Sequence, residues 1–121
     1  MSSLNDFKVS ENFNLREFVS PDTNEVKLES EVVFRLQKLR DLIGRAITVT
    51  SGYRTPEYNQ QVGGVPRSYH MLGQAADIYC SGMSTKKLAQ LANEVGFRGI
   101  GTYVKDGFVH VDVGPKRAWT G

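Results

Sequence analysis

Two histidines and an aspartate are the residues of this 121-residue chain whose types and spacing could hold a metal ion. His70 and Asp77 lie seven positions apart in the segment RSYHMLGQAADIYC (residues 67–80), and His110 follows in a later segment, FVHVDV. Two imidazoles and one carboxylate suit zinc with a fourth position open for water. Structural zinc sites usually have four protein ligands, commonly cysteines, whereas this chain has a single cysteine. The donor set therefore favours a catalytic or exchangeable site.

The spacing alone leaves a second interpretation open. A separation of seven residues is no standard helical ligand spacing, and short motif matches carry false positives. Two histidines and an aspartate in a small domain are often unrelated, and a lone strand histidine is usually a satisfied side chain. Cys80 is expected to be a small buried hydrophobe rather than a nucleophile.

The candidate ligands belong to two predicted strands and the loop before the first of them. Residues 74–80 and 108–113 alternate between two faces, as strands do. In each strand one face is wholly apolar and is expected in the core, and the other face carries Asp77 or His110. If the strands are neighbours, these two side chains converge, and His70 is within reach from the preceding loop. The apolar sets are Ala76, Ile78 and Cys80 in the first strand and Val109, Val111 and Val113 in the second.

The remaining elements are predicted from caps, periodicity and turn residues. They are a turn capped by Asn14, a helix from Ser30 to Gly44 with a stripe of Val33, Leu36, Leu39 (or Leu42) and Ile43, a strand at 46–51, a helix from Thr55 to Gly63, a loop at 65–73, a helix from Ser84 to Gly96, and a hairpin of 99–104 and 108–113. This order predicts an α+β fold with a small, mostly antiparallel sheet flanked by helices. We expect a single domain over residues 1–121, of which residues 1–11 form a loosely ordered N-terminal segment.

Composition excludes several classes of protein. The chain is 40% hydrophobic and 23% charged, as expected of a soluble globular domain. Its net charge of +2 and its lack of Lys or Arg runs do not argue for a nucleic-acid partner. It has no apolar stretch long enough to span a bilayer and no apolar signal region near residue 1, so we expect no membrane insertion. Nothing demands more than a monomer.

Three stretches together carry a family resemblance. SYHMLGQAAD fits S-x-H-x-x-G-x-A-x-D, HVD follows on the terminal hairpin, and SGYRTPEYN lies upstream. The combination resembles the zinc D-Ala-D-Ala carboxypeptidases and related peptidoglycan endopeptidases of the M15 type, over about residues 12–119. That family shares its fold with the N-terminal signalling domain of Hedgehog proteins. The resemblance therefore implies a Hedgehog/DD-peptidase fold.

The resemblance also implies a zinc-dependent peptidase, endolysin-like, that cleaves peptidoglycan stem peptides. It implies one Zn²⁺ per chain with His70, Asp77 and His110 as ligands. Arg54 matches an arginine that orients the substrate and polarises the scissile carbonyl, and Ser68 matches a serine that binds the peptide end. From the residues alone, Arg54 could equally be a surface ion-pair partner, and Ser68 could merely satisfy backbone groups of the loop.

The general base departs from the family pattern. Many members place a glutamate or aspartate a few residues before the last histidine, but residues 107–109 of this chain are Gly, Phe and Val. Asp106 is further back and is expected to be a turn residue. Asp112, on the same strand face as His110, is predicted to be either the base or a partner that orients an imidazole. This departure keeps open the alternative of a non-catalytic, zinc-containing domain that binds cell wall or a partner.

Four aromatic residues are candidates for a substrate groove. Tyr53, Tyr69, Tyr103 and Trp119 could line a groove for a glycan–peptide strand, and we expect Tyr103 to contact the substrate. Equally, Tyr53 and Trp119 could be core or rim packing, the commoner use of such residues.

The expected place of action is the bacterial cell wall. Without a signal peptide, the protein would be made in the cytoplasm, as a phage or prophage lysin or a virion-associated enzyme is. The same observation fits a piece of a longer protein. The sequence does not show which peptide bond would be cleaved.

Overall fold

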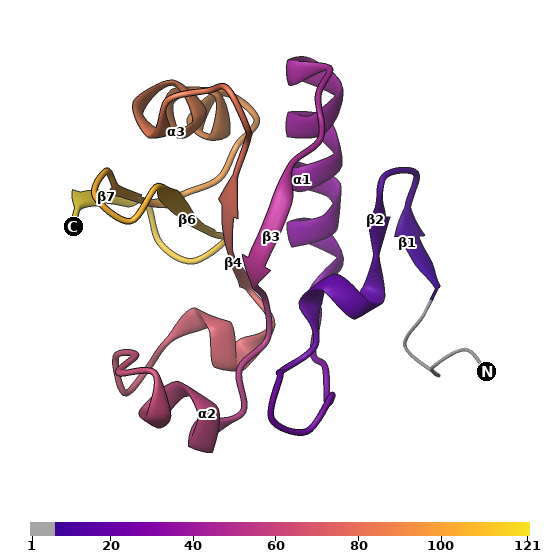
Figure 1. Ribbon diagram of the computed structural model, residues 1–121, viewed down its shortest axis with the longest axis vertical. Coiled ribbons are helices and arrows are strands. Elements are labelled where there is room, and N and C mark those ends of the chain that lie inside the picture. The colour runs from indigo at the N-terminus through magenta and orange to yellow at the C-terminus, as the bar shows by residue number, and fades with distance from the viewer. Residues whose placement is uncertain (1–6) are drawn as a thin grey trace.

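A five-stranded sheet in the order β3-β4-β6-β5-β7 forms the centre of the fold in the computed structural model, which describes residues 7–121 (Figure 1). All neighbouring strands are antiparallel except β5 and β7, which are parallel. The predicted α+β fold with a mostly antiparallel sheet is therefore confirmed. The strands are β3 (Thr48–Ser51), β4 (Ala75–Tyr79), β5 (Gly99–Tyr103), β6 (Phe108–Asp112) and β7 (Arg117–Thr120).

Helices and a small second sheet surround these strands. The α-helices are α1 (Ser30–Ile43), α2 (Pro56–Gln61) and α3 (Thr85–Glu94), and the 3-10 turns are η1 (Leu15–Phe18) and η2 (Tyr69–Leu72). The second sheet pairs β1 (Lys8–Ser10) with β2 (Phe13–Asn14). In Figure 1, α3 lies at the upper end of the view and α2 at the lower end, with the central strands between them. No helix among the described residues is long and apolar enough to cross a membrane.

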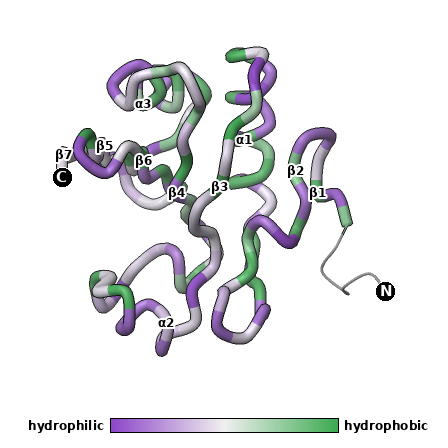
Figure 2. The backbone as a smooth tube through the Cα atoms, in the orientation of Figure 1, coloured by the Kyte–Doolittle hydropathy of each residue, from purple (hydrophilic) through white to green (hydrophobic). Residues whose placement is uncertain are grey.

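The core lies between the helices and one face of the sheet. The predicted apolar sets of β4 and β6 are buried there with residues of α1 and α3. Hydrophobic and hydrophilic stretches alternate along both helices in Figure 2, as expected of helices that bury one side. The core side chains include Val32, Leu36 and Leu39 of α1, Leu88 and Ala92 of α3, and Ala76, Ile78, Val109 and Val111 of the sheet. The opposite face of the sheet, which carries Asp77 and His110, is thus left for chemistry.

The predicted caps hold with one exception. Asn14, Thr55 and Ser84 accept hydrogen bonds from backbone N–H groups two or three residues on, and Gly44 ends α1 with a left-handed φ of 74°. Ser30 is instead the first residue of α1, and the preceding Glu29 occupies the cap position without a side-chain hydrogen bond.

Three segments differ from expectation. The loop predicted at 65–73 contains η2, because Ser68 Oγ accepts a hydrogen bond from the His70 N–H and Gly73 turns the chain with a φ of 71°. Residues 8–10, within the segment expected to be loosely ordered, form β1, while residues 1–6 lie outside the described part of the chain. Strand β7 was not predicted, because its parallel pairing with β5 is a long-range contact that a four-residue pattern does not reveal.

Candidate metal centre and pocket

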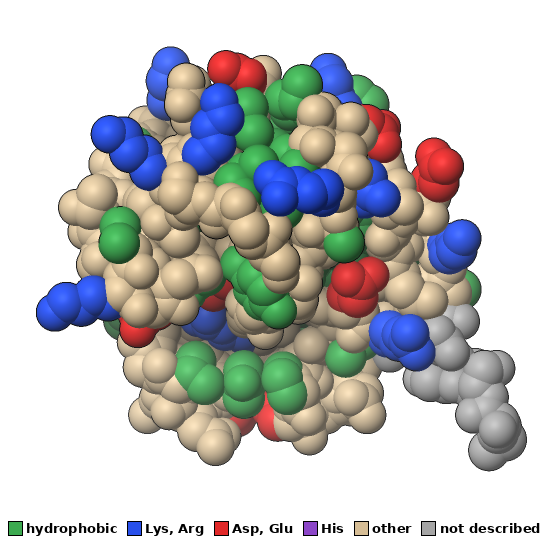
Figure 3. Space-filling model, turned by 45° about the horizontal axis from the view of Figure 1, so that its top comes forward, with side chains coloured by type: hydrophobic (Ala, Val, Ile, Leu, Met, Phe, Trp, Pro, Cys, Tyr) green, Lys and Arg blue, Asp and Glu red, His purple; other side chains and the backbone are tan. Residues whose placement is uncertain are grey.

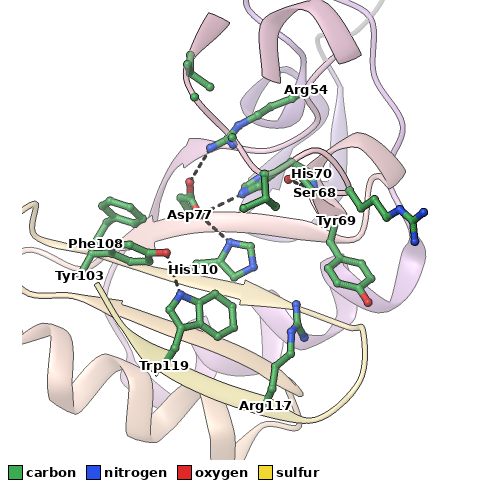
Figure 4. A pocket seen from close by; sticks show the side chains of 15 residues that line it. Arg54, Ser68, Tyr69, His70, Asp77, Tyr103, Phe108, His110, Arg117 and Trp119 are labelled. Carbon is green, nitrogen blue, oxygen red and sulfur yellow. Dashed lines mark hydrogen bonds and ion pairs between the residues drawn. The ribbon is translucent and has the colours of Figure 1, made fainter. Parts of the chain in front are cut away.

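Strand register brings the candidate ligands together. Asp77 of β4 lies directly opposite His110 of β6, and His70 comes from η2, just before β4. His70 Nε2 is 3.2 Å from Asp77 Oδ1, and His110 Nδ1 is 3.1 Å from the same oxygen. One donor atom from each of the three residues lies within 4.8 Å of the other two. The three side chains therefore converge from separate elements, as Figure 4 shows.

Hydrogen bonds on the far side of each ring select the nitrogen that faces this point. His70 Nδ1 is 2.7 Å from the carbonyl oxygen of Gly52, which can only accept, so a neutral His70 keeps its proton on Nδ1 and directs the lone pair of Nε2 inward. His110 Nε2 is 2.7 Å from Asp112 Oδ2, so a neutral His110 keeps its proton on Nε2 and directs the lone pair of Nδ1 inward. In the neutral rings that a metal ion would require, both lone pairs thus point to the side of Asp77 Oδ1.

The distances from both ring nitrogens to Asp77 Oδ1 match those expected around a tetrahedral zinc ion. Zinc bonds to nitrogen and carboxylate oxygen are about 2.0–2.2 Å long, which places neighbouring ligand atoms about 3.3 Å apart. The distances of 3.1 and 3.2 Å to Asp77 Oδ1 are close to that value. Each ring also has the outer hydrogen-bond partner that metal-bound histidines almost always have. Three protein ligands would leave one coordination position for a substrate or water.

The charges of the cluster reinforce one another. Burial alone would raise the pKa of the Asp77 carboxyl, but hydrogen bonds with His110 and His70 hold that pKa well below its usual range. Burial would lower the pKa of His110, but its hydrogen bonds with Asp112 and Asp77 raise it above the ordinary value. The pKa of Asp112 falls to about 2, since the hydrogen bonds from His110 and Arg117 outweigh its burial. Both carboxylates are therefore anionic at neutral pH.

Arg54 is held against the free side of Asp77. Its Nη2 donates to Asp77 Oδ2 at 3.1 Å, its Nε donates to Ser51 Oγ at 3.1 Å, and its Nη1 donates to Asn59 Oδ1 at 3.3 Å. Its backbone N–H donates to the His70 carbonyl oxygen at 3.1 Å. The alternative of a surface ion-pair partner is thus replaced by an ion pair inside the cluster. Asn59, which is 3% exposed, could not be predicted as a site residue, because nothing in its position in α2 indicates this contact.

Gly52 gives the cluster its close approach to the N-terminal segment. A Cβ at position 52 would come within 2.6 Å of the Phe18 Cα. A side chain there would therefore push the Gly52 backbone, whose carbonyl binds His70, away from the Phe18 backbone. The backbone N–H of Tyr53 donates to the Phe18 carbonyl oxygen at 2.8 Å. The tight pairing of these two segments fixes the position of the carbonyl that orients His70.

A pocket of about 670 Å³ opens above the three candidate ligands. Its walls are the segment after α2 on one side and aromatic residues of the sheet on the other (Figure 4). In Figure 3, a hollow with basic side chains inside it lies between hydrophobic side chains. The lining residues are Arg54, Val62, Gly63, Gly64, Val65, Arg67, Ser68, Tyr69, His70, Asp77, Tyr103, Phe108, His110, Arg117 and Trp119.

The aromatic candidates divide between pocket and core. Tyr103 stacks on Phe108 with ring centroids 4.6 Å apart, and its hydroxyl accepts a hydrogen bond of 2.8 Å from the Trp119 indole. Tyr69, Tyr103 and Trp119 line the pocket, whereas Tyr53 is 7% exposed and lies outside the lining. Ser68 also faces the pocket, and its hydroxyl accepts from the His70 N–H at 3.2 Å.

Asp77 is the only carboxylate among the described residues that line the pocket. Asp112 is 0% exposed, and its two oxygens accept from His110, Arg117 and the Gly114 N–H. Asp106 is exposed in the turn between β5 and β6 and is not part of the lining. Among the described residues, the pocket lining thus contains no carboxylate besides the candidate ligand Asp77 that could act as a general base.

Comparison with known proteins defines the class to which this fold and site belong. The profile of the Peptidase M15 family matches residues 5–112, so the chain belongs to the M15 peptidases.

Two kinds of relative stand out within that class. The chain is 33% identical over 92 residues to the peptidoglycan L,D-endopeptidase MepK of Escherichia coli (strain K12), a match that covers 70% of this chain and 50% of that protein. It is 36% identical over 92 residues to the zinc D-Ala-D-Ala carboxypeptidase of Streptomyces albus G, covering 73% of this chain and 36% of that protein. The chain thus spans about half the length, or less, of these curated relatives.

Proposed function

We propose that this protein is a zinc-dependent peptidase that cleaves peptidoglycan stem peptides, as a carboxypeptidase or a cell-wall endopeptidase. The observation that carries the proposal is the convergence of His70 Nε2, Asp77 Oδ1 and His110 Nδ1 beside a pocket, with both histidine rings oriented by partners behind them. The M15 relatives support it, since one is named as a peptidoglycan endopeptidase and another as a zinc carboxypeptidase. We assign one Zn²⁺ per chain to these three ligands.

Residues around the three ligands are proposed to bind the substrate and to stabilise the charge that develops during the reaction. Zinc at this position would polarise the scissile carbonyl and lower the pKa of a water molecule. Arg54 places positive charge beside the ligands, where it can orient the substrate carbonyl and stabilise the charge that develops on its oxygen. Ser68 and Tyr103 are proposed to contact the peptide, because both line the pocket.

We assign Asp112 to the orientation of His110 rather than to proton transfer. The side chain is fully buried beneath His110 and does not line the pocket, so it is out of reach of a substrate. A general base must come within hydrogen-bond reach of the proton that it takes. The sequence allows two roles for Asp112, general base or orienting partner of His110, and its buried position supports the second.

The same observation supports a second candidate function. A domain that keeps zinc for stability and binds cell wall without hydrolysis needs no proton-carrying carboxylate, and the described pocket offers none besides Asp77. For either function we propose a monomer without a nucleic-acid partner that acts at the bacterial cell wall, as a phage or prophage lysin or a virion-associated protein would.

Digestion of purified sacculi tests the two candidates. Zinc-loaded protein is incubated with sacculi, and soluble products are identified by mass spectrometry, with a parallel sample treated with a chelator. We expect stem-peptide fragments whose masses identify the cleaved bond and which disappear on chelation. Sedimentation of the protein with sacculi and no soluble product would favour the binding domain instead. If zinc-loaded protein neither sediments with sacculi nor releases product, both candidates are wrong.

Protons should compete with zinc for the two ring nitrogens. Both rings must be neutral to bind the metal, and the pKa of His110 is raised, so below that pKa zinc must displace a proton. We expect the zinc dissociation constant to rise by at least about tenfold for each pH unit below the pKa of His110 and to level off above it. Competition with a chromophoric chelator between pH 5.5 and 8.5 measures this, and a flat profile would argue against histidine ligands.

A further inference from the structure

Arg117 ends a chain of hydrogen bonds that begins at His110. Asp112 Oδ2 accepts from His110 Nε2 and from Arg117 Nη2, each at 2.7 Å. Asp112 Oδ1 accepts from Arg117 Nη1 and from the Gly114 N–H, each at 3.0 Å. Because Asp112 is 0% exposed, these donors take the place of water around both of its oxygens.

The arginine is itself held on several sides. Its guanidinium lies between two aromatic rings of the pocket, 4.8 Å from the Tyr69 centroid and 5.2 Å from the Trp119 centroid (Figure 4). Its Nη1 also donates to the Pro115 carbonyl oxygen at 2.8 Å. The guanidinium can therefore adopt few other orientations.

Strand β5 leaves room for this pair. A Cβ at Gly99 would collide with Asp112 Oδ1 and Arg117 Nη1, so no other residue fits at position 99 without moving the ion pair. Gly99 lies opposite both partners, pairing with Asp112 on β6 and with Arg117 on β7. The three strands thus meet around one buried carboxylate and one guanidinium.

We propose that Arg117 is a positioning residue, which fixes the orientation of Asp112 and through it the ring orientation and tautomer of His110. This inference rests on the metal site of the proposed function. A guanidinium fork matches a carboxylate in one plane, so two parallel hydrogen bonds prevent the rotation of Asp112 that a single bond would allow. An acceptor fixed at His110 Nε2 requires the ring proton there, and Nδ1 then faces the metal position.

The first test compares zinc affinity among variants. Arg117→Gln removes the fork, Arg117→Lys keeps the charge without the fork, and Lys116→Gln removes an equal charge from the exposed neighbouring position. Competition with a chromophoric chelator should show zinc binding about 10–100-fold weaker for Arg117→Gln, the range typical of lost partners behind a metal ligand. Arg117→Lys should lie between that variant and the wild type, and Lys116→Gln within about twofold of the wild type.

The second test observes the ring proton of His110 directly. In zinc-loaded protein labelled with ¹⁵N-histidine, we expect a resolved Nε2–H signal for His110 that exchanges slowly with water, and exchange at least about tenfold faster in Arg117→Gln. A wild-type proton on Nδ1 would overturn the proposal. So would a folded Arg117→Gln protein with unchanged zinc affinity and ring-proton exchange.

Both readouts separate this proposal from the proposed function. Zinc affinity and ring-proton exchange can both be measured in a protein that does not cleave sacculi. Conversely, if Arg117→Gln changes neither of them, the digestion of sacculi still tests the proposed function. Should Arg117→Gln not fold, zinc affinity of Arg117→Lys and the ring proton of the wild type decide the question.

Discussion

Asp77→Asn is expected to abolish both zinc retention and peptidase activity. The substitution removes the only negative charge among the three ligands while nearly preserving shape, and it also deprives both histidines and Arg54 of their shared anionic partner. Zinc per chain, measured by atomic emission after gel filtration, should fall from about one to below about a tenth. Release of product from sacculi should fall on the order of a thousandfold, as expected for the loss of a catalytic metal worth several kcal/mol.

Asp106→Asn is the matched control for that variant. It makes the same change of carboxylate to amide in the exposed β5–β6 turn, outside the pocket. Its zinc content and activity should equal those of the wild type. If Asp77→Asn retains zinc and activity while remaining folded, Asp77 is not a ligand.

Asp112→Asn is expected to cause the largest loss of stability among single polar substitutions in the site. The amide keeps only one of the two accepting oxygens, and its NH₂ group would face Arg117 or His110 in place of the other. Breaking a buried ion pair costs about 3–5 kcal/mol. The Arg117 side chain is 35% exposed and partly screened by solvent, so we expect about 3 kcal/mol, the lower end of that range.

Urea unfolding at neutral pH measures this loss, with Asp41→Asn on the exposed side of α1 as control. The midpoint should move to lower urea with little change in slope, since the surface exposed on unfolding is the same. Zinc affinity should fall about 10–100-fold as well, because His110 loses its orienting partner. A folded Asp112→Asn protein with wild-type stability would contradict the structural role assigned to this carboxylate.

The sequence allowed much of the sheet to be predicted because strands reveal their faces. Alternation assigned Val109 and Val111 to the core and His110 to the opposite face, and the structure buries the two valines completely. Alternation does not show which strands are neighbours, so the convergence of Asp77 and His110 depended on a pairing that only the fold supplies. In α1 the apolar stripe was ambiguous for a similar reason, and the structure buries Leu39 and leaves Leu42 54% exposed.

The surroundings of the site were harder to predict, because they come from contacts between distant segments. Asn59 and Arg117 carry no local signal of their roles, since the first reaches Arg54 from α2 and the second reaches Asp112 from an unpredicted strand. Asp112 had two possible roles in the sequence, and its complete burial became apparent only with β5 and β7 in place. Local patterns thus indicated the ligands, and tertiary packing supplied their support.

The central claim is that three side chains share one divalent ion, and anomalous diffraction from crystals grown with zinc tests it most directly. Data collected on the two sides of the zinc absorption edge should give one strong peak per chain, about 2.0–2.2 Å from His70 Nε2, Asp77 Oδ1 and His110 Nδ1. A map without a peak among these atoms, or with zinc bound only by other residues, would contradict the account.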